Sequence, residues 1–193
     1  MTESTRVEVL KTEEVDADLR NTIIEICVAA HQEEDFRNLF SYVSSGGLHF
    51  LGFEGERVVS HAVVTTRWLQ PEGHCLLRTA YIDAVATLPG AQGRGHGSTL
   101  MRSLARKIDD DYVIGCLETD RVGFYERLGW ELWRGPLAGR SDQGLIPTPE
   151  QKGIMILRLS QTPDLNLDST LTIVCEGQRI WSRGNSAGLL ETS

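Results

Sequence analysis

One short segment constrains the fold of this chain more than any other: an apolar, strand-like run leads into a glycine-rich turn, and a helix follows. The run covers residues 81–86, the turn reads QGRGHG at 92–97, and apolar residues recur at helical spacing over 98–108. The first turn of a helix carries four unpaired N–H groups and the positive end of the helix dipole, and glycine lets a backbone approach an anion closely. The segment therefore predicts a binding site for a diphosphate.

Other glycine-rich sites do not fit this turn. No Gly-Lys-Ser/Thr follows it, so it is not a P-loop, and the spacing of its glycines differs from that of a dinucleotide fingerprint. A flexible turn without a ligand is the remaining alternative, and the strand before and helix after it argue against that. Gln92, Gly95 and Gly97 fit the pattern Q/R-x-x-G-x-G/A of the GCN5-related N-acetyltransferases (GNAT). This resemblance implies a bound acyl-CoA.

Length and charge limit the class of protein. The chain has 193 residues, which suits one domain, and we expect a single domain over 1–181 with a flexible tail over 182–193. No apolar run reaches membrane-spanning length and the polar start is unlike a signal peptide, so we expect a cytoplasmic protein. A formal net charge of −8 argues against nucleic acids and anionic membranes as partners.

The cysteines give no sign of a metal site or a disulfide framework. The chain has four cysteines, scattered without a C-x-x-C pair, at Cys27, Cys75, Cys116 and Cys175. We expect buried, reduced thiols and no bound metal.

The order of elements predicts an α/β fold with a mixed sheet flanked by helices. Alternating and apolar runs predict strands at 6–10, 48–53, 57–67, 78–87, 112–117, 130–133, 154–159 and 171–175. Helical spacing and caps predict helices at 16–30, 33–43, 98–108 and 121–128, the first with Asp16 as its N-cap. Residues 135–153 hold three prolines and several glycines and are expected to form one long, functional loop.

Two side chains are candidates for acyl transfer from a thioester to an amine, which needs a proton acceptor and a proton donor. Tyr125 lies on the predicted short helix, where its phenol could protonate the departing thiolate; the alternative is a core aromatic. Asp83 is the only charged residue in the apolar run at 81–86. It could accept a proton through water or bind an ammonium group, and the alternative is a solvated face of the strand.

Further acids could complete a pocket for a cation, although most acidic runs are solvated surfaces. The candidates are Glu33, Glu34, Asp35, Glu118 and Glu176.

Within the GNAT superfamily, the chain resembles the aminoglycoside 2′-N-acetyltransferases over residues 6–181. The similarity is carried by GGLH at 46–49, VVSHAVV at 58–64, YIDAVA at 81–86 and YERLGW at 125–130, with further matches at 133–136 and 147–149.

The resemblance implies acetyl-CoA as donor, a cationic aminoglycoside as acceptor, antibiotic resistance as the outcome, and a homodimer. It implies splayed central strands that hold acyl-CoA, with Asp83 as the strand acid and Tyr125 as general acid. The residues implied for the cofactor are Val85, Ala86, Thr87, Gln92, Gly93, Arg94, Gly95, His96, Gly97 and Ser98. The residues expected at the acceptor are Asp35, Asp83, Ala84, Glu118, Glu150 and Glu176.

Several positions depart from the family pattern. Asp83 replaces a glutamate, Glu150-Gln151-Lys152 replaces an acidic run, and Trp181, where the family usually ends, is followed by twelve residues. These differences favour a non-standard acceptor such as kasugamycin. The rival interpretations are a GNAT that acetylates another small amine or a peptide, and a non-catalytic acyl-CoA sensor.

Overall fold

The computed structural model describes residues 6–43, 45–175 and 180–181. Its contacts divide the chain into two compact units. Unit 1 contains Met1–Thr65 and Ile82–Ile108, and unit 2 contains Thr66–Tyr81 and Asp109–Ser193. Two long strands, β3 (Arg57–Pro71) and β4 (Leu77–Thr87), contribute residues to both units.

In the described residues of unit 1, the strands follow the order β1-β2-β3-β4. Strand β2 pairs antiparallel with β1 on one side and with β3 on the other. Besides the two shared strands, its elements are β1 (Arg6–Lys11), η1 (Thr12–Glu14), α1 (Ala17–His31), η2 (Glu34–Asn38), α2 (Leu39–Tyr42), β2 (Leu48–Glu54), η3 (Pro89–Ala91) and α3 (His96–Ile108).

Helix α1 begins where the sequence predicted. The Asp16 side chain accepts a hydrogen bond from the Leu19 N–H at 2.9 Å, which satisfies one of the unpaired donors of the first turn. The helix buries Ile23, Ile26 and Cys27 in a cluster with residues of β2, β3 and β4. Its apolar stripe therefore covers one face of the unit 1 strands.

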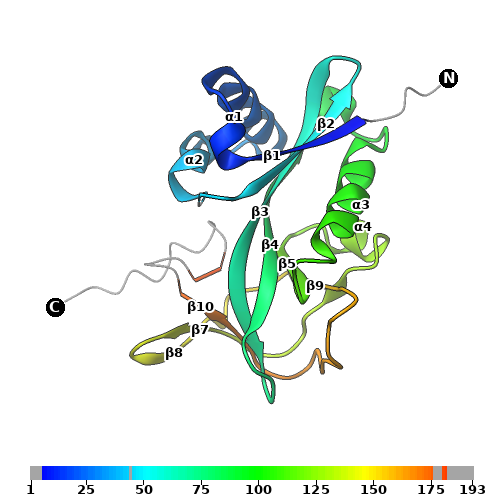
Figure 1. Ribbon diagram of the computed structural model, residues 1–193. Coiled ribbons are helices and arrows are strands. Elements are labelled where there is room, and N and C mark those ends of the chain that lie inside the picture. Colours follow the sequence, from blue (N-terminus) through cyan, green and yellow to red (C-terminus); the bar gives the residue numbers. More distant parts are fainter. Residues whose placement is uncertain (1–5, 44, 176–179, 182–193) are drawn as a thin grey trace. The chain divides into compact units, whose positions relative to one another are not determined.

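Helix α3 covers the other face. A Cβ added to Gly52 of β2 would lie 3.3 Å from Leu100 of α3, whereas the neighbouring Leu51 belongs to the cluster beneath α1. Successive strand residues point to opposite faces, so α1 and α3 lie on opposite sides of β2 (Figure 1). The unit is a three-layer sandwich of helix, sheet and helix.

The described residues of unit 2 form strands in the order β6-β9-β5-β4-β3-β10-β7-β8. Strand β9 runs antiparallel to β5 and β6, and β10 runs antiparallel to β3 but parallel to β7, so the sheet is mixed. Its own elements are β5 (Ile114–Glu118), α4 (Val122–Glu126), β6 (Glu131–Leu132), β7 (Leu137–Ser141), β8 (Gly144–Pro147), β9 (Ile154–Arg158) and β10 (Leu171–Val174).

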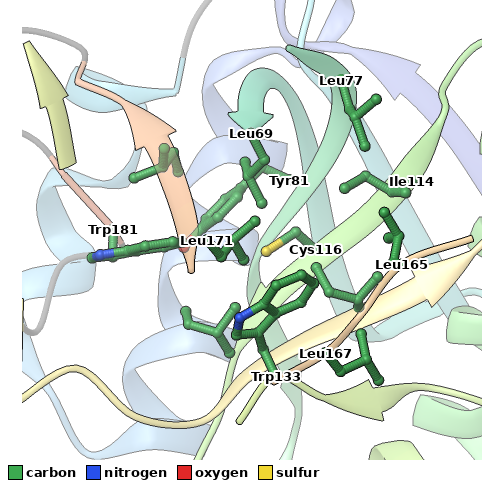
Figure 2. Packing of buried hydrophobic residues seen from close by; sticks show 13 residues of the cluster. Leu69, Leu77, Tyr81, Ile114, Cys116, Trp133, Leu165, Leu167, Leu171 and Trp181 are labelled. Carbon is green, nitrogen blue, oxygen red and sulfur yellow. The ribbon is translucent and has the colours of Figure 1, made fainter. Parts of the chain in front are cut away.

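Tryptophans anchor the core of unit 2. Figure 2 shows the Cys116 sulfur among the rings of Tyr81 and Trp133 and the side chain of Leu171. The two indole N–H groups have partners: Trp133 donates to the Ser169 carbonyl at 2.9 Å, and Trp181 donates to the Thr148 hydroxyl at 3.0 Å. The rings thus bury a large apolar area without leaving a polar atom unsatisfied.

The predicted α/β fold with a mixed sheet is confirmed, but the predicted loop at 135–153 is wrong. It contains the hairpin β7–β8, in which Ser141 pairs with Gly144. Most of the prolines and glycines that suggested a loop lie near the ends of short strands. Gly139 lies within β7, where an added Cβ would be too close to Ile180 and Cys175. Pairing with β10, which is distant in sequence, makes β7 a strand.

Two smaller expectations also need correction. The helix predicted at 33–43 is a 3-10 helix followed by a single α-helical turn. All four cysteines are free, but Cys75 is exposed and Cys175 is half-buried, whereas buried thiols were expected. Among the described residues, no helix has both the length and the apolar character needed to cross a membrane.

Candidate functional site

The glycine-rich turn of unit 1 has the backbone that a helix-start anion site needs. Helix η3 ends at Ala91 and is followed by Gln92, whose side-chain amide donates to the Thr87 carbonyl at 3.0 Å and ties the turn to the end of β4. Gly93 and Gly95 have φ angles of 75° and 88°, a region that favours glycine, and α3 begins at His96. These two glycines set the direction in which the first turn of α3 presents its N–H groups.

The surroundings of the turn are suited to a negative ligand. A cavity of about 360 Å³ beside it is lined by Arg57, Arg94, Glu54, Leu88 and helix η3. Arg94 forms an ion pair with Glu54, and the first turn of α3 contains no acidic residue. Two guanidinium groups and a helix start are the usual components of a phosphate site.

We expect Gly95→Ala to weaken acetyl-CoA binding about tenfold, which is about 1.4 kcal/mol. An added Cβ meets no atom within 4 Å, so the effect comes from forcing a left-handed backbone onto alanine. Calorimetric titration measures the affinity. Gly73→Ala is the matched control, because Gly73 has a φ of 79° and open space in the β3–β4 turn. An equal loss of affinity in both variants would contradict the assignment.

Strand β4 contains a break in its extended backbone at Ala84. This residue has a φ of 50°, which costs an alanine roughly 1–2 kcal/mol. The half-buried Asp83 side chain accepts a hydrogen bond from the Ala84 N–H at 2.9 Å. The carboxylate proposed for catalysis therefore also accepts a backbone hydrogen bond, and this bond supports the left-handed conformation of Ala84.

A row of buried polar side chains reaches the Ala84 carbonyl. His61 Nδ1 lies 3.0 Å from that oxygen, His61 Nε2 lies 3.0 Å from His49 Nδ1, and His49 Nε2 lies 3.2 Å from the Thr12 hydroxyl. The Cys27 thiol is also within hydrogen-bond distance of the Ala84 carbonyl, at 3.8 Å. Both imidazoles are fully buried.

Burial keeps both imidazoles neutral. It lowers the pKa of His49 from 6.5 to about 4, assisted by the nearby charge of Arg20, and the pKa of His61 to about 3. In both cases desolvation of the charged form is the main cause. At neutral pH each ring then has one N–H donor and one acceptor nitrogen.

These pKa values predict loss of stability in acid. The unfolded histidines bind protons near pH 6.5 and the folded ones only near 4 and 3, so stability is complete above pH 6.5 and falls as the pH drops. Between pH 7 and 5 we expect the free energy of unfolding to fall by about 4 kcal/mol, measured by urea denaturation. In His49→Gln about half of that pH dependence should disappear; an unchanged dependence would contradict the assignment.

Strand β4 is held at two further carbonyls. His31 Nε2 lies 3.0 Å from the Val85 carbonyl, and its ring stacks on Phe36 with centroids 4.7 Å apart. The Thr87 carbonyl accepts from Gln92, as described above. Side chains from α1 and the glycine-rich turn therefore fix residues 85–87, the segment that the family resemblance implied for the cofactor.

Tyr125 belongs to unit 2, on α4. It is 6% exposed, and its ring makes edge contacts with Phe124 and Trp130. A phenol is protonated at neutral pH at its ordinary pKa, and burial raises the pKa of this one further. That state suits a proton donor, and the packing shows that Tyr125 is also a core aromatic, the alternative considered from sequence.

The predicted site residues divide between the two units. Asp35, on η2, is exposed and lies in unit 1 with Asp83 to Thr87 and the glycine-rich turn. The half-buried Glu118 at the end of β5 and the exposed Glu150 lie in unit 2 with Tyr125. Glu176 and the tail at 182–193 lie outside the described residues.

The residues that hold β4 were not predicted as site residues from the sequence. His49 and His61 lie within the segments that carry the family resemblance, and no motif pointed to Thr12, Cys27 or His31. A signal was present, because each of the two histidines interrupts an apolar strand of the predicted hairpin. In the described part of the chain, no group of three or more His, Cys, Asp or Glu side chains is arranged to hold a metal ion.

Comparison with known proteins places this geometry in context. Residues 11–133 match the model of the acetyltransferase (GNAT) domain. The chain is 28% identical over 169 residues to the aminoglycoside 2′-N-acetyltransferase of Mycolicibacterium fortuitum, a match that covers 86% of this chain and 85% of the relative.

Two solved structures illustrate the likeness in fold. The GNAT family N-acetyltransferase YhbS of Escherichia coli, solved in complex with CoA, has a TM-score of 0.61 at 14% identity and covers 95% of this chain and 99% of its own. A GCN5-related N-acetyltransferase of Kribbella flavida has a TM-score of 0.53 at 21% identity over 68% of this chain. The present chain spans only 34% of the Kribbella protein. At these identities the likeness concerns the fold alone.

Proposed function

The chain belongs to the acetyltransferase (GNAT) domain family, and from this premise we propose that it transfers the acetyl group of acetyl-CoA to an amine of an aminoglycoside. The observation that carries the acceptor class is the 28% identity to an aminoglycoside 2′-N-acetyltransferase, which extends over 86% of the chain. The observation that supports the donor is the left-handed turn at Gly93 and Gly95 at the start of α3.

The cofactor is proposed to bind along the end of β4 and the turn that follows. The N–H groups at the start of α3, together with Arg94 and Arg57, suit the diphosphate. The backbone from Val85 to Thr87 would pair with pantetheine, whose amides are hydrogen-bonding partners of the same kind as a peptide strand.

The proposed reaction needs two proton transfers. Asp83 accepts a proton from the acceptor ammonium, through a water molecule, and the neutral amine attacks the thioester carbon. The carbon–sulfur bond breaks, an amide forms, and the departing thiolate takes a proton from the Tyr125 phenol. A buried, protonated phenol and a half-buried carboxylate match these two tasks.

The charge of the protein suits a cationic acceptor. The formal net charge is −8, and acidic side chains that could receive ammonium groups lie at Asp35, Asp83, Glu118 and Glu150. Acetylation removes one positive charge and its charge-assisted hydrogen bonds, so the product would bind its RNA target less tightly. Resistance to the antibiotic is the proposed outcome, and kasugamycin is the proposed acceptor because of the departures around Glu150 and after Trp181.

The test is acetyl-CoA-dependent release of free thiol with a panel of amines. The panel contains deoxystreptamine aminoglycosides, kasugamycin, polyamines and short peptides. Turnover confined to one aminoglycoside group would support the proposal and identify that group. Turnover with polyamines or peptides alone would contradict the proposed aminoglycoside acceptor and identify another class of amine. Acetyl-CoA binding without turnover on any amine would favour a non-catalytic acyl-CoA sensor.

A further inference from the structure

We propose that His61 is a positioning residue, which holds the Ala84 carbonyl so that the Val85 N–H is directed to the thioester oxygen of acetyl-CoA. This inference rests on the proposed acetyl transfer. His61 does not touch the reacting atoms; it acts through one peptide group of β4. Three observations within unit 1 carry it: the direction of the hydrogen-bond chain, the planarity of the peptide, and the second anchor at His31.

The hydrogen-bond chain has only one consistent direction. The Ala84 carbonyl can only accept, so His61 donates to it from Nδ1. The other nitrogen of a neutral His61 must then accept, and its partner is the Nδ1–H of His49. His49 Nε2 in turn accepts from the Thr12 hydroxyl. The Thr12 hydroxyl also lies 3.2 Å from the Gly47 carbonyl, but its single proton goes to His49 in this arrangement. The Gly47 carbonyl is still satisfied, because the backbone N–H of Thr12 donates to it at 2.9 Å.

Every donor in this chain therefore points toward the Ala84 carbonyl. Neutral rings are required, because a second proton on His61 would face the N–H of His49. The burial that lowers both pKa values supplies that neutral state. The result is a carbonyl fixed toward the buried interior by His61 and by the Cys27 thiol.

The geometry of a trans peptide transmits this constraint to the next residue. The described peptide bonds are trans, and in a planar trans peptide the C=O and the following N–H point in opposite directions. With the Ala84 oxygen held toward His61, the Val85 N–H must point away from it. Such an N–H at the turn of a strand is a suitable donor to the developing oxyanion of acyl transfer.

The two groups that flank this peptide are also fixed. Asp83 accepts from the Ala84 N–H, and His31 lies 3.0 Å from the Val85 carbonyl. The left-handed Ala84 is thus constrained on both sides by side chains, and a small rotation of its peptide would redirect the Val85 N–H. This explains why two fully buried imidazoles lie beneath a strand whose remaining buried neighbours are mainly apolar.

The discriminating experiment compares His61→Asn with His61→Leu. The Asn amide nitrogen is at the same number of bonds from Cβ as His Nδ1 and can donate to Ala84, whereas Leu cannot. We expect His61→Leu to lower kcat by about 10- to 100-fold, toward the effect of losing an oxyanion donor, with the acetyl-CoA dissociation constant within about threefold of the parent. His61→Asn should recover most of kcat although it breaks the link to His49.

A purely structural role predicts a different outcome. Equal losses of kcat in the two variants, or a folded His61→Leu protein with the parent's kcat, would overturn the proposal. If His61→Leu does not fold, nitrogen NMR of the parent protein decides: the Nδ1–H tautomer of His61 is expected, and the Nε2–H tautomer would overturn the proposal.

A binding readout separates this inference from the proposed function. Acetyl-CoA should shift the Val85 amide resonance in the parent and in His61→Asn, and much less in His61→Leu. If these Val85 shifts are seen but no amine is acetylated, the role of His61 is supported and the proposed acetyl transfer is contradicted. Aminoglycoside turnover with the same Val85 shift in both variants would leave the function standing and overturn the inference.

Discussion

Tyr125→Phe is expected to lower kcat for acetyl transfer by about 10²-fold or more, the usual contribution of a positioned general acid. Removing the hydroxyl leaves the departing thiolate without its proton donor, while the ring keeps its edge contacts with Phe124 and Trp130. The acetyl-CoA dissociation constant should change less than about twofold, since the diphosphate site belongs to other residues. Steady-state kinetics and calorimetric titration measure the two quantities.

Phe124→Leu is the matched control for Tyr125. It disturbs the same ring cluster but leaves the phenol in place, so kcat should stay within a few-fold of the parent. The raised pKa of Tyr125 adds a pH criterion. The phenol should stay protonated as the pH passes the ordinary tyrosine pKa of 10, so its ionisation should not lower the rate in that pH range. A Tyr125→Phe protein with the parent's kcat would refute the role and leave Tyr125 as a core aromatic.

Asp83→Asn is expected to lower kcat at neutral pH by about 10²-fold or more through loss of the proton acceptor. The amide keeps an oxygen that can accept from the Ala84 N–H, so the backbone of β4 should be preserved and the melting temperature nearly unchanged. The defect should shrink as the pH rises toward the pKa of the acceptor amine, because a neutral amine no longer needs the base. A pH–rate profile of both proteins tests this.

Asp83→Ala separates the two tasks of the carboxylate. It removes the proton acceptor and the oxygen that supports the left-handed Ala84, so its rate should fall below that of Asp83→Asn and should not recover at high pH. Full activity of Asp83→Asn at neutral pH would contradict the proposed proton transfer. Equal rates for the two variants would show that the bond to Ala84 has no part in catalysis.

Local signals were sufficient for much of the fold. The N-cap at Asp16 predicted the start of α1, and the glycine-rich turn predicted the start of α3. These elements are specified by residues only a few positions apart. The hairpin β7–β8 was not predicted. Its strands are short and contain glycine, and β7 is defined by pairing with β10, more than thirty residues further along the chain.

The candidate site shows the same division. A single acid in an apolar strand and the glycine spacing at 92–97 identified Asp83 and the diphosphate turn as candidates, because their chemistry is local. The support beneath Ala84 could not be identified in that way. Its members, Thr12, Cys27, His49 and His61, come from four separate elements, and nothing in their spacing indicates that they meet.

The sequence by itself determined most of the elements and the family, and it identified Asp83 and Tyr125 as candidates for acetyl transfer. Only the tertiary structure decided which of these residues are constrained. A left-handed alanine is unfavourable in isolation, and it is held here because buried donors, neutral through desolvation, converge on its carbonyl. Both the desolvation and the convergence depend on packing among distant segments, so they exist only in the folded chain.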